Sequence, residues 1–131
     1  MIALDTNLLL RLLTHDDPAQ LAALGRFFTA HPGETFLVPD VVLAEAVWTL
    51  RSGFRWDRPQ IAAALRRLAG KPDVEFADRD HVAAALKALE AGGDFADELI
   101  VGRAREDGCA SLATFDTALQ ARHPKFALQP K

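Results

Sequence analysis

The chain has 131 residues, half of them hydrophobic, and a formal net charge of −3. This length is typical of one domain with a buried core, so we predict a single domain over residues 1–131. No apolar run could span a membrane, and no basic region precedes a hydrophobic segment at the N-terminus, so we expect a cytoplasmic protein without a secretory signal.

The first predicted strand ends in three polar residues. We predict a strand over residues 1–5 and a helix over residues 7–13, with Asp5, Thr6 and Asn7 at the junction. Each of these residues could cap the helix, but three capping residues exceed the need of one helix. In open α/β sheets, ligands bind beyond the carboxyl ends of the strands. Asp5 is therefore a candidate site residue.

An acid interrupts an apolar helix in the next part of the chain. We predict a helix over residues 18–30, a strand over 35–38 and a helix over 40–52, whose apolar sequence contains Glu45. The residues three and four positions away include no basic partner: they are Val41, Val42, Trp48 and Thr49. A carboxylate among apolar neighbours is costly unless it is paired, protonated or bound to metal. We interpret Glu45 as a metal ligand; pairing with a distant arginine is the alternative.

Two acids open a later helix. Before it we predict a helix over residues 58–69, a strand over 74–76 and a helix over 79–91. The next helix is predicted over residues 94–107, where the spacing of three places Asp94 and Asp97 on one helical face. Asp94 alone would be an ordinary N-cap favoured by the helix dipole. Asp97 lies one turn further in, on the side where the core is expected.

The last candidate acid follows a late strand. We predict a strand over residues 111–114, a short helix after Asp116 and a final strand over 126–128. Asp116 could simply cap its helix. Its pairing with Thr114, and its position after a strand like that of Asp5, place both acids at the same edge of a predicted parallel sheet. Short strands separated by one or two helices predict an α/β fold with helices on both faces of a small sheet.

No other catalytic or metal-binding pattern stands out. The four histidines lack the paired spacing of zinc sites, and no glycine-rich phosphate loop is present. The single Cys109 cannot form an internal disulfide, and we expect it to be a buried small residue. Aspartate and glutamate oxygens select Mg²⁺ or Mn²⁺ over zinc. Such ions polarise phosphodiesters and activate water, so the four acids together favour phosphodiester chemistry.

The ordered set of motifs resembles the PIN domain family. Four segments carry the resemblance: Leu4-Asp5-Thr6-Asn7, Glu45 within Leu-Ala-Glu-Ala-Val-Trp-Thr-Leu, Asp94-Phe95-Ala96-Asp97, and Thr114-Phe115-Asp116. More narrowly, the chain is similar to the VapC-type toxins of bacterial and archaeal toxin–antitoxin (VapBC) pairs, from Met1 to about Phe126. The resemblance implies a three-layer α/β/α fold with a small, mostly parallel central sheet. It also implies a magnesium- or manganese-dependent endoribonuclease that is homodimeric and inhibited by a cognate VapB-like antitoxin.

The resemblance also assigns roles to individual residues. It implies that the catalytic, metal-binding quartet is Asp5, Glu45, Asp97 and Asp116. It implies that the supporting residues are Asn7, Asp94, Thr114 and Thr6. The chain departs from the pattern at Glu98, which follows Asp97 where relatives often have a small or apolar residue, and which we expect to face solvent.

The negative net charge raises the question of how RNA would bind. Basic residues are concentrated in one stretch: Arg51, Arg55, Arg58, Arg66, Arg67 and Lys71. This cluster could form a basic rim that neutralises phosphates and guides RNA over an acidic centre. We take Arg51, Arg55 and Arg58 as candidate RNA-binding residues. For Arg66 and Arg67, an exposed helix face is at least an equal alternative.

Two other functions remain open from the sequence. In a different magnesium-dependent phosphohydrolase, such as a haloacid-dehalogenase-like phosphatase, Asp5 would be the covalent nucleophile. That mechanism requires a second acid two residues later, where this chain has Asn7. In a non-catalytic PIN-like binding module, the acids would have no role that offsets their mutual repulsion. We therefore favour the nuclease.

Overall fold

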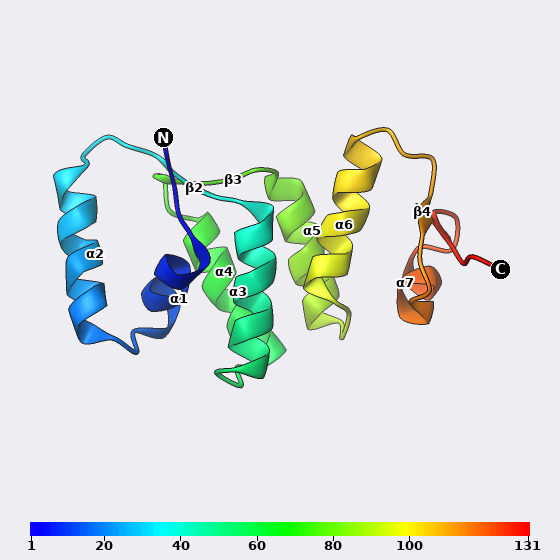
Figure 1. The fold of residues 1–131 in the computed structure, drawn as a ribbon, viewed down its shortest axis with the longest axis horizontal. Coiled ribbons are helices and arrows are strands. Elements are labelled where there is room, and N and C mark those ends of the chain that lie inside the picture. Colours follow the sequence, from blue (N-terminus) through cyan, green and yellow to red (C-terminus); the bar gives the residue numbers. More distant parts are fainter. The chain divides into compact units, whose positions relative to one another are not determined.

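The computed structural model describes all residues from 1 to 131, and they divide into two compact units, residues 1–79 and 80–131. Seven helices and five short strands follow one another along the chain (Figure 1). Every predicted helix and strand is present in the predicted order. The α/β fold class is confirmed, and its helices and small parallel sheets are consistent with the predicted three-layer fold. None of the helices combines the length and the apolar character needed to cross a membrane.

The first unit contains a three-stranded parallel sheet and four helices. The strands are β1 (Ile2–Ala3), β2 (Phe36–Val38) and β3 (Val74–Phe76), in the order β1-β2-β3. The helices are α1 (Thr6–Thr14), α2 (Pro18–Ala30), α3 (Asp40–Ser52) and α4 (Arg58–Ala69). Helix α1 packs against both α2 and α3, while α4 packs against α3 and β3. These contacts place the start of α1 beside the middle of α3, which matters for the site.

The helices of the first unit differ in how deeply they are buried. Leu9 of α1, Leu43 and Leu50 of α3, and Ile61 and Leu65 of α4 have no exposed surface. By contrast, α2 has no buried residue at all. Its apolar side chains therefore remain partly open to solvent, and Figure 1 shows α2 as the outermost helix of this unit.

The second unit is built from three helices and a two-stranded parallel sheet. The helices are α5 (Arg79–Glu90), α6 (Phe95–Glu106) and α7 (Thr117–Arg122). The strands are β4 (Leu112–Ala113) and β5 (Ala127–Leu128). Val101 of α6, Leu119 of α7 and Phe126 form a buried cluster that holds α6 and α7 together. The Arg105 guanidinium lies 4.6 Å from the centre of the Phe126 ring and covers part of that cluster.

Two expectations about the fold are corrected. The strands form two hydrogen-bonded sheets rather than one, because β1 pairs with β2 whereas β4 pairs only with β5. Asp5 and Asp116 each follow a strand as predicted, but those strands belong to different sheets. Cys109 is exposed, not buried, because it lies in the turn after α6 that Gly108 (φ 82°) forms.

Candidate functional site

Asp5 caps the first helix. Its Oδ1 accepts a hydrogen bond from the Leu8 N–H at 3.0 Å, which satisfies a backbone donor that α1 itself cannot pair. The side chain is exposed, and the cap uses only one of its two carboxylate oxygens. Asn7, predicted to support the site, is also exposed. Asp5 therefore caps α1 through one carboxylate oxygen, and its other oxygen remains available to bind a ligand.

Glu45 lies on the exposed side of α3, not among buried neighbours. Its Oε1 accepts a hydrogen bond from the Thr6 hydroxyl at 3.1 Å. The residues one turn to either side are also exposed: Val41 by 65% and Trp48 by 72%. The expectation that burial makes an unpaired Glu45 costly is therefore wrong, because Glu45 is exposed and lies between the exposed side chains of Val41 and Trp48. What links Glu45 to the start of α1 is its bond to Thr6.

The second unit brings three predicted site acids together. Asp94 caps α6 by accepting from the Asp97 N–H at 2.9 Å, and Asp116 caps α7 by accepting from the Leu119 N–H at 2.9 Å. Thr114 Oγ1 in turn accepts from the Asp116 N–H at 3.0 Å, so the threonine fixes the strand-to-helix turn that carries Asp116. These bonds determine where each carboxylate lies.

Asp97 is the electrostatic centre of that group. Partial burial raises the pKa of Asp97 above its ordinary value, and the negative charges of Asp94 and Asp116 raise it further. The positive charge of Arg122 opposes this rise in pKa, while a hydrogen bond with Asp116 adds to it. Crowded carboxylates that disfavour one another's ionisation are the arrangement that a bound cation would relieve.

Glu98 is not solvent-facing, contrary to expectation. Its side chain is only 9% exposed and accepts a hydrogen bond from Arg122 Nε at 2.8 Å. His123 Nε2 lies 2.9 Å from the other carboxylate oxygen. Glu98 thus joins α6 to the end of α7. Its two partners lie 24 and 25 positions further along the chain. No local sequence pattern predicts pairs this far apart, so the sequence does not reveal that Glu98 connects these helices.

The three candidate RNA-binding arginines lie around the end of α3. Arg51 and Arg55 are exposed, and Arg58 is partly buried. Arg55 adopts a positive φ of 57°, which is uncommon for any residue other than glycine. Two of the three predicted basic side chains are therefore accessible to a ligand.

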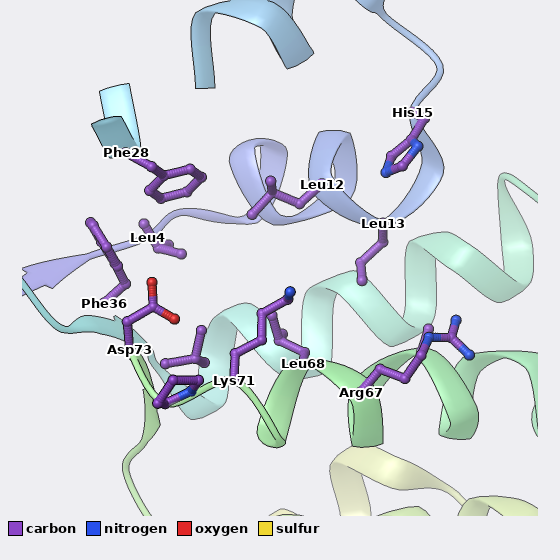
Figure 2. Close-up of a pocket in the computed structure, with 13 residues that line it drawn as sticks. Leu4, Leu12, Leu13, His15, Phe28, Phe36, Arg67, Leu68, Lys71 and Asp73 are labelled. Atoms are coloured by element: carbon purple, nitrogen blue, oxygen red, sulfur yellow. The ribbon is translucent and has the colours of Figure 1, made fainter. Parts of the chain in front are cut away.

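An apolar pocket of about 610 Å³ lies within the first unit, and none of the predicted site carboxylates lines it. Figure 2 shows Leu12 of α1, Phe28 of α2, and Leu4 and Phe36 projecting toward the hollow. Lys71 extends across it from the loop after α4, with Arg67 and His15 at one end and Asp73 at the other. The pocket is thus a second feature, apolar inside and mainly basic at its rim.

The donor set fits a hard divalent cation better than zinc. All the predicted ligands are carboxylates, and their supporting residues offer hydroxyl or amide oxygens. Oxygen-only ligands suit Mg²⁺ and Mn²⁺, whereas structural and catalytic zinc sites usually include histidine or cysteine. In the second unit, Asp97 and Asp116 could hold such an ion; in the first, Asp5 and Glu45 offer the same chemistry.

Comparison with known proteins identifies one family. The family model described as "PIN domain" matches residues 2–124, nearly the whole chain and parts of both units. Comparison with curated proteins gives no match, and comparison with solved structures gives none either.

Proposed function

This chain belongs to the PIN domain family, whose members are generally metal-dependent nucleases, and from that membership we propose that it is a magnesium- or manganese-dependent endoribonuclease. We propose further that it is the VapC-type toxin of a toxin–antitoxin pair, that it acts in the cytoplasm, and that residues 1–131 form one ribonuclease domain. The family match across both units supports this last point.

The observation that carries the proposal is the group of three acids in the second unit, where Asp94 and Asp116 are held by their helix caps and act electrostatically on Asp97. Partial burial and the charges of Asp94 and Asp116 raise the pKa of Asp97, a bound cation would offset this effect, and Asp97 belongs to the quartet that the family resemblance implies. We propose that Asp5, Glu45, Asp97 and Asp116 are the metal ligands and catalytic acids. Their supporting residues would be Thr6, Asn7, Asp94 and Thr114.

The chain's own residues would hold and orient the reacting groups. A bound divalent ion supplies Lewis-acid polarisation of the phosphodiester and activates water. Asp94 and Thr114 keep Asp97 and Asp116 in place through the helix caps and the turn described above. Thr6 holds Glu45 in one orientation by its hydrogen bond. Arg51, Arg55 and Arg58 would neutralise backbone phosphates outside the acidic centre.

The direct test is cleavage of cellular RNA by the purified protein. We expect discrete products with Mg²⁺ or Mn²⁺, none with a chelator, and none from Asp97→Asn. The matched control is Asp107→Asn, the same exchange at the exposed C-terminal end of α6, which should cut like the wild type. A second variant, Glu45→Gln, tests the first unit, because its amide oxygen can still accept from Thr6 while the charge is lost.

Three results would contradict the proposal. Equal cutting by Asp97→Asn and the wild type would show a contaminating nuclease. Metal binding without any cleavage of RNA would favour the binding module, and trapping of Asp5 by a phosphate analogue would favour the phosphatase. The phosphatase mechanism also requires a second acid two residues after Asp5, where this chain has Asn7.

We also propose two protein partners. One is a second copy of the chain, which sedimentation analysis of the purified protein would detect. The other is a VapB-like antitoxin, which we place in the pocket of the first unit. An amphipathic segment fits there, because its apolar side chains could fill the space between Leu12 and Phe28 while an acidic residue faced Arg67 and Lys71.

Charge reversal would test the proposed antitoxin site. Arg67→Glu with Lys71→Glu alters only exposed side chains, so the fold should survive. The double variant should cleave RNA normally yet resist inhibition by a candidate antitoxin. Arg26→Glu, an exposed residue of α2 outside the pocket, should remain fully inhibited. Equal inhibition of all three proteins would place the antitoxin elsewhere.

A further inference from the structure

We propose that the outward face of α3 binds a single-stranded stretch of RNA, with Trp48 stacking on a base next to the scissile phosphate. This inference rests on the proposed ribonuclease function, and it names the side chain that would hold the substrate of that site. It concerns residues of the first unit only.

The exposure of Trp48 is the starting observation. Its surface is 72% exposed, although a tryptophan normally contributes most of its large apolar area to a core or an interface. It lies three residues after Glu45, and therefore on the same side of α3, about 4.5 Å further along the helix axis. A flat aromatic surface is thus open to ligands one helical turn from a proposed catalytic acid.

Basic side chains continue the same face. Arg51 lies three residues after Trp48 and is exposed. Beyond it the chain turns at Gly53, and the turn is fixed by backbone bonds: the N–H groups of Gly53 and Phe54 both donate to the Thr49 carbonyl, at 2.8 and 3.2 Å. These bonds therefore hold the loop after Arg51 in one conformation.

That loop presents a second arginine in an unfavourable backbone conformation. Arg55 is exposed, and its φ of 57° is sterically unfavourable for a residue with a Cβ. The Trp56 N–H donates to the Leu50 carbonyl at 2.8 Å and so locks the loop after Arg55. A glycine at position 55 would adopt this φ without strain. An arginine at the same position instead places an exposed guanidinium on the loop.

The face therefore offers an acid, an aromatic ring and a cation in sequence, and the loop that follows it carries a second exposed cation. A single-stranded nucleic acid presents the complementary groups, namely a phosphate that metal can bind, a base that can stack and further phosphates along the backbone. Stacking on aromatic side chains is tolerant of sequence because every base has a π-face. It is not available to bases that are already stacked within a duplex. The substrate at this face should thus be unpaired RNA.

Fluorescence of Trp48 measures the contact directly. In a Trp56→Phe background Trp48 is the sole tryptophan, and we expect short single-stranded RNA of mixed sequence to quench it in the presence of a chelator, when nothing is cut. A strand of the same length without bases should not quench it, although its phosphates are the same. Trp48→Ala should weaken RNA binding about 5- to 150-fold, the range expected for one stacked base, whereas Trp48→Phe should retain most of the affinity.

Kinetics separate this role from catalysis. Trp48→Ala should raise KM for an unpaired substrate more than it lowers kcat, whereas Glu45→Gln should mainly lower kcat. The matched control is Val41→Ala, which removes a similarly exposed apolar side chain before Glu45, outside the stretch from Glu45 to Arg51 that carries the proposed contacts, and should bind RNA normally.

The outcomes distinguish this inference from the proposed function. If the wild type cuts RNA but Trp48→Ala binds and cuts like it, the stacking proposal is wrong and the ribonuclease stands. If Trp48 fluorescence changes with protein concentration alone, and Trp48→Ala alters the oligomeric state, a second copy of the chain covers this face and the proposal is overturned. If the wild type cuts no RNA at all, the proposed function itself fails.

Discussion

Three predicted site acids each cap a helix with one carboxylate oxygen. Asp5, Asp94 and Asp116 accept N–H bonds of 2.9 to 3.0 Å at the starts of α1, α6 and α7. From the sequence, capping and ligand binding are competing interpretations of these residues. In the structure they are compatible, because a carboxylate has two oxygens and the cap occupies one of them. The caps also hold the carboxylates at fixed positions before any ligand arrives.

Asp97→Asn should alter how the stability of the metal-free protein depends on pH. Because the pKa of Asp97 is raised in the folded state, the stabilisation linked to its proton is complete below about 3.8 and is lost as the pH rises through the folded pKa. Asparagine does not ionise, so the variant does not lose stability in this way. Its free energy of unfolding relative to the wild type should therefore increase as the pH rises through the folded pKa of Asp97. The change should be below about 1 kcal/mol, because solvent screens a partly exposed carboxylate.

Urea denaturation in the presence of a chelator, at acidic and at neutral pH, measures that difference. Asp107→Asn, the same exchange at the exposed end of α6, is measured beside it as the control. A difference between Asp97→Asn and the wild type that stays constant across the range would mean that burial and the neighbouring carboxylates do not raise the pKa of Asp97.

Thr6→Val should weaken metal binding while leaving the fold intact. It removes the hydroxyl that donates to Glu45 but keeps the shape of the side chain, and the pair is exposed. Loss of a group that orients a metal ligand commonly costs about 10- to 100-fold in metal affinity or activity. The dependence of cleavage on Mn²⁺ concentration would show this shift. Thr29→Val, whose hydroxyl bonds only within α2, should leave it unchanged.

At the scale of elements, Glu98 connects α6 with α7. Glu98→Ala would leave the Arg122 guanidinium without this partner, and Arg122 already has one buried nitrogen that lacks a hydrogen bond. We expect a loss of about 1–3 kcal/mol in the free energy of unfolding, measured by urea denaturation. Glu106→Ala removes a 59% exposed carboxylate of the same helix, together with its 3.8 Å contact with His81, and should change stability by less than about 1 kcal/mol. Equal effects of the two variants would show that the Glu98 pairs do not stabilise the protein.

The element boundaries were largely predictable from the sequence. Helices α2, α3 and α4 and strand β3 begin and end at the predicted residues. Pro18, Asp57 and Gly53 explain several of these ends, because proline and capping aspartate favour helix starts and glycine favours helix stops. Which side of α3 faces the core could not be predicted, because the helix is apolar on nearly every side and has no polar face that would be expected to contact water.

For the whole molecule, divalent metal should raise thermal stability. A ligand that binds only the folded state stabilises it by about 2.7 kcal/mol when its concentration is 100 times its Kd. Mg²⁺ or Mn²⁺ should therefore raise the melting temperature relative to a chelated sample. The rise should be much smaller for Asp97→Asn and for Glu45→Gln. A melting temperature that metal leaves unchanged in the wild type would count against the proposed site.

The sequence alone determined the order and type of the elements, the acids that start three helices, and the family. These follow from local patterns: apolar periodicity, capping residues and motif spacing act over a few positions along the chain. Tertiary structure decided that Glu45 and Trp48 face outward, that Glu98 pairs with Arg122 and His123, and that the strands form two sheets. Each of these depends on which distant segment packs against a given side chain, and no local pattern carries that information.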